Sequence, residues 1–155
     1  MGDLSFSISY TTRKPRENEK HGVDYFFITS EEFEQMRDDG FFLEWATVHG
    51  NSYGTGVHFV QSHLDAGKDI LLDIDVQGAQ QVRQRVADAI SILIFPPNYR
   101  LLYERLKNRR SDAEEVIQRR LQGARKELAR FHEYDYLIVN DDLQQATQEL
   151  TSILR

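Results

Sequence analysis

The sequence predicts an α/β protein with a doubly wound parallel sheet, and three short apolar segments support this prediction. Residues 70–75, 90–95 and 136–139 are runs of Ile, Leu, Val and aromatic residues that end at acidic residues, prolines or an asparagine. Nearly continuous apolar runs of this length are typical of parallel strands covered on both faces. Segments with helical periodicity separate and follow them, which is the alternation of an α/β fold.

The expected helices in this second half of the chain are residues 79–86, 100–109, about 113–131 and 143–154. In the first half, residues 6–9 alternate apolar and polar side chains, and residues 23–28 are rich in aromatic and β-branched ones. We expect strands in both segments, and short strands and turns over residues 41–56.

Two further helices are expected in the first half. The spacing of Thr29 and Glu32 is that of a capping box, which opens a helix, and Gly40 would end that helix. Phe59 and Leu64 indicate a second helix that ends near Gly67.

The composition is that of a single soluble, globular domain. The chain has 155 residues, of which 40% are hydrophobic and 28% charged, enough to bury a core without the character of a disordered chain. No run approaches the roughly 18 apolar residues of a membrane span, and the N-terminus is not a secretory signal. The chain has no cysteine, which excludes disulfides and Cys-based zinc sites. We therefore expect a cytoplasmic protein that binds no membrane.

Charge is distributed unevenly along the chain. The net charge is −6, which argues against a nucleic-acid partner, but residues 100–130 carry ten Lys or Arg against five Asp or Glu. Two interpretations remain open for this segment: a solvated helical face, or a cationic patch for a small polyanion such as a nucleoside triphosphate.

A first candidate site is the segment from Ser9 to Arg16. Hydroxyl-bearing residues precede Arg13, Lys14 and Arg16 where a strand gives way to a loop. Guanidinium groups bind phosphate bidentately and hydroxyls add neutral donors, so the loop could enclose a phosphate dianion. An exposed basic loop without a ligand is the alternative.

A second candidate site surrounds Glu44, a lone carboxylate among apolar neighbours. An ionised carboxylate offers two acceptors, and guanine presents two adjacent donors, N1–H and N2–H, which adenine cannot match. The hydroxyl of Thr55 could donate to guanine O6, and the phenols of Tyr25 and Tyr53 could reach a phosphate oxygen. A surface glutamate on an alternating strand is the alternative. Polar residues also end the predicted parallel strands, where ligands of such sheets bind: Asp73, Asp75 and Asn140.

Six segments in this order resemble the guanylate kinase family, and its bacterial members most closely. They are Ser9 to Arg16, Gly22 to Tyr25, Phe42 to Trp45, Gly50 to Thr55, Leu72 to Gly78 and Val139 to Asp142. The resemblance runs from about Phe6 to the C-terminus. It implies a P-loop-kinase-like fold in one domain, residues 1–155. Within that domain it implies a small mixed β region for GMP (about 6–56), a core sheet with helices (69–97 and 136–155) and a helical lid (about 100–132).

The resemblance also implies a role for each matching residue. GMP would be bound by Ser9, Arg13, Arg16, Tyr25, Glu44, Tyr53, Thr55, Asp73 and Asp75. The lid arginines that approach the transferred phosphoryl group would be Arg105, Arg109 and Arg120. Arg109 and Asn140 would lie on the ATP side. The implied reaction is ATP + GMP → ADP + GDP, with Mg²⁺ accompanying ATP and no residue of this chain assigned to the metal. Such a reaction needs positioning and positive charge and no protein nucleophile.

The sequence departs from the family in two places. None of its nine glycines belongs to a G-x-x-x-x-G-K-[ST] loop, and about 25 to 30 residues that carry this loop and the first strand in relatives are missing. We therefore expect little or no turnover from this chain, with GMP binding retained, and exposed edges and apolar faces on the neighbouring strands. Arg110 stands where relatives have glycine, which bears on closure of the lid.

Two other functions remain open. One is an inactive guanylate-kinase-like module that binds phosphorylated partners through the former GMP site. A nucleic-acid module would rest on residues 100–130 alone, and the overall acidity opposes it. The oligomeric state is not readable from the sequence.

Overall fold

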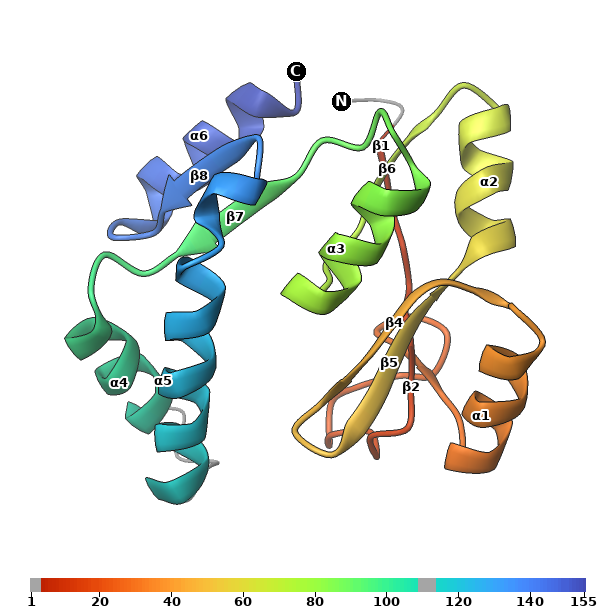
Figure 1. The fold of residues 1–155 in the computed structure, drawn as a ribbon, viewed down its shortest axis with the longest axis horizontal. Helices are drawn as coiled ribbons and strands as arrows, with labels where there is room; N and C mark the ends of the chain where they lie inside the picture. Colours follow the sequence, from red (N-terminus) through yellow and green to blue (C-terminus); the bar gives the residue numbers. More distant parts are fainter. Residues whose placement is uncertain (1–3, 109–113) are drawn as a thin grey trace. The chain divides into compact units, whose positions relative to one another are not determined.

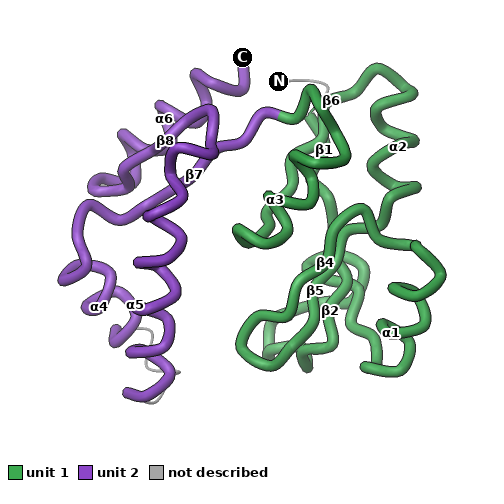
Figure 2. The backbone as a smooth tube through the Cα atoms, in the orientation of Figure 1, with its two compact units in different colours: residues 1–89 green, residues 90–155 purple. Residues whose placement is uncertain are grey.

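The computed structural model describes residues 4–108 and 114–155, which form two compact units (Figure 2). Unit 1 ends at Ala89 and unit 2 begins at Ile90. Arg109 and Arg110 lie outside the described residues. None of the described helices has the length and apolar character needed to cross a membrane.

The described residues of unit 1 form two sheets and three helices (Figure 1). Strand β1 (Leu4–Phe6) pairs in parallel with β6 (Asp69–Leu71). The second sheet has the order β3-β2-β5-β4, from β3 (Phe26–Phe27), β2 (Tyr10–Thr11), β5 (Asn51–Gly56) and β4 (Phe42–Val48). The helices are α1 (Ser30–Asp38), α2 (Val57–Asp65) and α3 (Val76–Arg85).

The hairpin of β4 and β5 is the longest strand pair of unit 1. Both residues of its turn, His49 and Gly50, have positive φ (52° and 82°), which is the backbone of the two-residue turns that fit strand twist. The pairing shifts by one residue between Phe42 and Glu44, so a bulge immediately precedes Glu44.

The core of unit 1 lies between this hairpin and helices α2 and α3. Leu43, Val60 and Val82 form its buried centre, one from each of these elements. On α1, Phe33 is buried and stacks on Phe42 with ring centroids 4.6 Å apart. The hairpin is therefore held by apolar packing from three helices, which fixes the strand that carries Glu44.

Unit 2 is built around one parallel strand pair. Strand β7 (Ile92–Phe95) pairs with β8 (Tyr136–Val139), and Leu93 and Ile138 are buried. The helical elements are α4 (Tyr99–Asn108), α5 (Glu114–Leu128), the 3₁₀ turn Phe131–Glu133 and α6 (Leu143–Ile153). The α/β class predicted from the sequence is confirmed.

The helices agree with the sequence better than the strands do. The capping box is present, with Thr29 accepting from Glu32 N and Glu32 accepting from Thr29 N. Strands expected over 6–9, 23–28 and 70–75 are shorter, since β1 ends at Phe6, β3 covers Phe26–Phe27 and β6 ends at Leu71. Residues 23 and 24 instead form a turn, in which both N–H groups donate to the carbonyl of Lys20.

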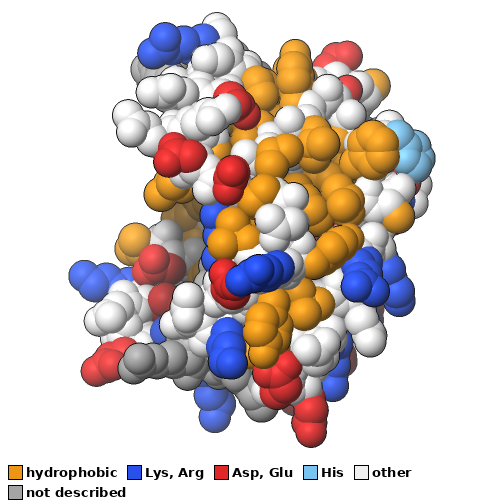
Figure 3. Space-filling model, turned by 90° about the vertical axis from the view of Figure 1, so that its left-hand side faces the viewer, with side chains coloured by type: hydrophobic (Ala, Val, Ile, Leu, Met, Phe, Trp, Pro, Cys, Tyr) orange, Lys and Arg blue, Asp and Glu red, His pale blue; other side chains and the backbone are white. Residues whose placement is uncertain are grey.

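The expectation that the apolar strands are covered on both faces is wrong for β7 and β8. Ile94, Leu137 and Val139 are 51%, 45% and 48% exposed, although Leu93 and Ile138 beside them are buried. Phe6, on β1, is likewise 56% exposed. Figure 3 shows hydrophobic side chains gathered together on the surface of the protein.

Candidate functional site

Arg13 is held tightly in the loop that follows β2. Its guanidinium makes a bidentate ion pair with Glu19 (2.8 and 2.9 Å) and donates to the carbonyl of Lys14 at 2.8 Å. The Glu19 carboxylate raises the pKa of Arg13, and the hydrogen bond from Arg13 lowers the pKa of Glu19. The ion pair fixes the position of the Arg13 guanidinium, and Glu19 offsets its charge.

Two phenols border this guanidinium. The Arg13 guanidinium carbon lies 5.4 Å from the ring centroid of Tyr25, and the rings of Tyr25 and Tyr53 meet edge to face at 6.1 Å. Burial raises the pKa of Tyr25, and the nearby Asp73 carboxylate adds to the shift. Arg13, Tyr25, Tyr53 and Asp73 are therefore neighbours.

Arg16 is far more open to solvent than Arg13. Its side chain is 73% exposed and its terminal nitrogen is 4.0 Å from Glu19, whereas its backbone N–H donates to Glu19 at 2.8 Å. Glu19 thus binds both arginines. Its carboxylate accepts from the side chain of Arg13 and from the backbone N–H of Arg16. Ser9 is half-buried directly before β2.

The other half of the unit 1 site is a buried pair of side chains. Glu44 on β4 is 3% exposed and Thr55 on β5 is fully buried, and the Thr55 hydroxyl donates to Glu44 Oε1 at 2.6 Å. The two residues are direct cross-strand partners. Burial raises the pKa of Glu44, the Thr55 hydrogen bond opposes the shift, and the Asp75 carboxylate adds to it.

Helix α3 begins against this carboxylate. Asp75 is its N-cap and accepts from Gly78 N at 2.9 Å, and a Cβ on Gly78 would lie 2.2 Å from Glu44 Oε2. The absence of a side chain at position 78 therefore admits the carboxylate to the first turn of the helix, where the helix dipole favours negative charge.

Strand β5 joins the two halves. Tyr53 and Thr55 are two residues apart, so their side chains leave the same face of the strand ~7 Å from each other. The Arg13 group and the Glu44 group therefore border one side of a single sheet in unit 1, with arginines and phenols at one end and a buried carboxylate at the other.

Unit 2 brings two other predicted residues together. Arg105 on α4 donates to the carbonyls of Asn140 (2.9 Å) and Asp141 (3.1 Å), directly after β8. A hollow of about 250 Å³ is lined by both Arg105 and Asn140, with Ile94, Phe95, Pro96, Leu102 and Leu106. Arg120 is half-buried on α5, and Arg109 lies outside the described residues.

A sequence model described as guanylate kinase matches residues 2–155. The chain belongs to the guanylate kinase family. A guanylate kinase of Chromobacterium violaceum is 51% identical over 98% of this chain and 72% of its own length, and one of Geobacter sulfurreducens is 48% identical over 97% and 74%. A crystal structure of the guanylate kinase from Anaplasma phagocytophilum matches with a TM-score of 0.82 at 36% identity, covering 98% of this chain and 74% of that one.

Few residues of this guanylate kinase family member could coordinate Mg²⁺. In the described part of the chain, no three His, Asp or Glu side chains form a group that could hold a metal ion. Mg²⁺ does not need such a cage, because it keeps water and substrate phosphates as most of its ligands and takes one or two carboxylates. Asp73, exposed after β6, fits that limited role.

Several residues that shape this site escaped the sequence analysis. Glu19 pairs with Arg13, Gln81 binds the backbone of Trp45, and Arg85 donates to the carbonyls of Phe42 and Leu43. The spacing of Glu19 from Arg16, three residues, was a usable signal. The contacts of Gln81 and Arg85 link residues more than 30 positions apart, and their sequence has no pattern that indicates them.

Proposed function

We propose that this chain serves the reaction ATP + GMP → ADP + GDP, with guanine read by Glu44 in unit 1. The buried pair of Glu44 and Thr55 supports this most directly. A carboxylate that is removed from water and bonded, among the described residues, only to Thr55, through its hydroxyl and its backbone, is costly unless further donors meet it. The N1–H and N2–H groups of guanine are such donors, whereas the N1 of adenine is an acceptor.

Thr55 would change its acceptor when the base enters. In the ligand-free chain its hydroxyl donates to Glu44 Oε1. With guanine bound, N1–H and N2–H would take the two carboxylate oxygens, and the hydroxyl would turn to guanine O6. Asp75, which adds negative charge beside Glu44, lies on the base side of the proposed site.

The phosphate of GMP would lie at the other end of β5, among the arginines and phenols. We assign it to Ser9, Arg13, Arg16, Tyr25 and Tyr53, with Asp73 beside them. Glu19 already holds Arg13 by the bidentate geometry that a phosphate would use, so the dianion would compete with this carboxylate. Arg16 has the exposed guanidinium that is available first.

Residues of unit 2 would bind ATP. We assign Asn140 and the hollow that it lines to the adenine side, and Arg105, Arg109 and Arg120 to the phosphates and the transferred group. Mg²⁺ bound with ATP would supply charge neutralisation at the phosphates, and Asp73 is a carboxylate that could accept hydrogen bonds from its water. The arginines supply positive charge where negative charge spreads over the transferred oxygens.

Calorimetry on the 155-residue chain tests the base and phosphate assignments without requiring turnover. We expect GMP to bind at least about tenfold more tightly than AMP, a difference of ~1.4 kcal/mol. Equal binding of the two nucleotides would refute the assignment to Glu44. Selective binding of a phosphopeptide would instead favour a module that holds phosphorylated partners. A coupled ADP-release assay measures the GMP-dependent turnover that the proposed reaction requires.

A further inference from the structure

Strand β4, which carries Glu44, is the outer strand of its sheet within the described residues. One edge of β4 pairs with β5, and its other edge presents peptide N–H and C=O groups that need partners. An edge strand held on one side only can move, and movement of β4 would displace the carboxylate.

Gln81 of α3 supplies partners for the residue next to Glu44. Its Nε2 donates to the Trp45 carbonyl at 2.6 Å, and its Oε1 accepts from the Trp45 N–H at 3.2 Å. The carboxamide thus pairs with both polar groups of one peptide residue, as a neighbouring strand would. These two bonds also determine which end of the amide is the nitrogen, because the Trp45 carbonyl needs a donor and the Trp45 N–H needs an acceptor; the same nitrogen also donates to the Gln77 carbonyl at 3.3 Å.

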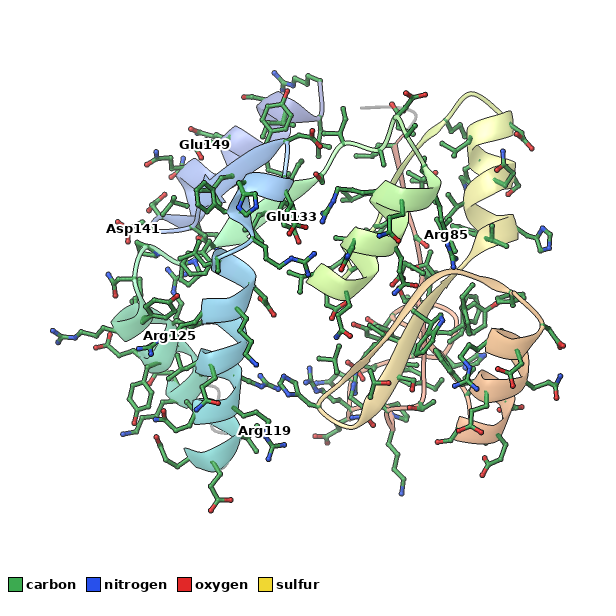
Figure 4. All side chains as sticks on the ribbon, in the orientation of Figure 1. Arg85, Arg119, Arg125, Glu133, Asp141 and Glu149 are labelled. Atoms are coloured by element: carbon green, nitrogen blue, oxygen red, sulfur yellow. The ribbon has the colours of Figure 1, made fainter. Side chains whose placement is uncertain are left out.

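Two more residues of α3 meet β4 on either side of this contact. Arg85 donates to the carbonyl of Phe42 at 3.1 Å and to that of Leu43, and Figure 4 shows its side chain between α3 and the start of β4. Gly78 faces the Glu44 carboxylate. Positions 78, 81 and 85 share one face of the helix, since they are three and four residues apart.

We propose that Gln81 is a positioning residue for base recognition, holding β4 so that Glu44 meets both donors of guanine at once. The inference rests on the proposed function of Glu44. A carboxylate that accepts two parallel hydrogen bonds must stay within about 0.5 Å of its place. Hydrogen bonds on both sides of Glu44, to Trp45 from Gln81 and to Leu43 from Arg85, restrain its backbone.

The experiment compares Gln81→Ala with Gln80→Ala, a matched change at an exposed glutamine on the same helix. The ligands are GMP and IMP, which differ only in the 2-amino group of the base. Binding is followed by fluorescence of Trp45, the single tryptophan of the chain, and by calorimetry. We expect Gln81→Ala to weaken GMP binding about tenfold and IMP binding less, so that the GMP-to-IMP preference falls, whereas Gln80→Ala leaves both unchanged.

A loss of fold alone would weaken GMP and IMP equally, so the ratio separates positioning from stability. Gln81→Met, which keeps the side-chain length without its polar atoms, repeats the test if the alanine variant fails to fold. Amide hydrogen exchange at Trp45 should become faster in either Gln81 variant. An unchanged GMP-to-IMP ratio in a folded variant would overturn the inference. A wild-type chain without preference for GMP over IMP would refute the role of Glu44 instead. In that case, unchanged hydrogen exchange at Trp45 in the Gln81 variants would also refute the restraint of β4 by Gln81.

Discussion

Glu44 occupies a position that weakens the fold at neutral pH. Burial raises the pKa of its carboxyl group, so the folded chain holds this proton more tightly than the unfolded chain. The resulting stabilisation is fully present below the unfolded pKa, about 4.3. It is lost as the pH rises through the higher pKa of the folded state. A residue retained at such a cost is typical of a binding site.

Glu44→Gln removes this titration and keeps the acceptor that Thr55 uses. We expect the variant to unfold at a higher urea concentration than the wild type at pH 8, and the difference to shrink at pH 5. The same variant should bind GMP at least about tenfold more weakly, because an amide NH₂ would face the N–H donors of guanine. Urea unfolding at both pH values and calorimetry with GMP measure the two effects. A stability difference that stays constant between pH 5 and pH 8 would contradict the raised pKa.

Helices could be predicted from the sequence more closely than strands, and β8 is the exception among the strands. Strand β8 has the predicted bounds, and α6 begins at the predicted Leu143. Helices carry their own hydrogen bonds and caps, so periodicity and capping residues are sufficient signals. Strands β1 and β6 end early because a strand extends only as far as its partner follows it, and the sequence does not state where that is.

The site follows the same division. The types of the candidate residues and their order along the chain were enough to single out Glu44, Thr55, Arg13 and Tyr25. The sequence did not indicate the ion pair of Arg13 with Glu19 or the hydrogen bonds from α3 to β4. These contacts form only between side chains and backbone groups that the fold brings together. The bidentate pair consumes donors of Arg13 that the sequence analysis left available, so Arg16 is the more accessible of the two arginines.

Two helix glycines allow the approach of α3 to Glu44 to be tested. Neither has a positive φ, so alanine fits both helices and should favour them by up to ~1 kcal/mol. A Cβ on Gly123 of α5 meets no heavy atom within 4 Å, whereas one on Gly78 would lie 2.2 Å from Glu44 Oε2 and 3.3 Å from Ile74 Cβ. We expect Gly123→Ala to stabilise the chain and to leave GMP binding intact. Gly78→Ala should instead destabilise the chain, because the overlap with the buried carboxylate outweighs the gain in helix propensity, and should weaken GMP binding about tenfold.

Chemical unfolding and GMP titration of the two variants provide the comparison. The buried Glu44 side chain has little room to retreat, because Thr55 holds its other oxygen. Equal GMP affinity in Gly78→Ala and the wild type would mean that the carboxylate can move without loss of function, which would contradict its assignment as a fixed reader of the base.

At the scale of the whole molecule, the proposed reaction divides between the two units. The residues assigned to GMP come from residues 1–89, and those assigned to ATP come from residues 90–155. Each unit has its own parallel strand pair, β1 with β6 and β7 with β8, and within the described residues each strand of a pair has one neighbour. Free strand edges and exposed apolar side chains therefore occur together in unit 2.

This combination predicts self-association, because an exposed apolar strand with an open edge is a template for pairing with another chain. The net charge of −6 opposes it, so association should increase when salt screens the repulsion. Leu137→Lys, on β8, should lower the apparent mass at high concentration, because a charge on the strand must lose its hydration on contact. Leu143→Lys is the control, since Leu143 is more exposed, at 72%, but lies on α6. Sedimentation over a range of concentrations, at low and at high salt, measures the effect. A wild-type chain that stays monomeric in both conditions, or an equal response of the two variants, would show that the strands of unit 2 do not drive association.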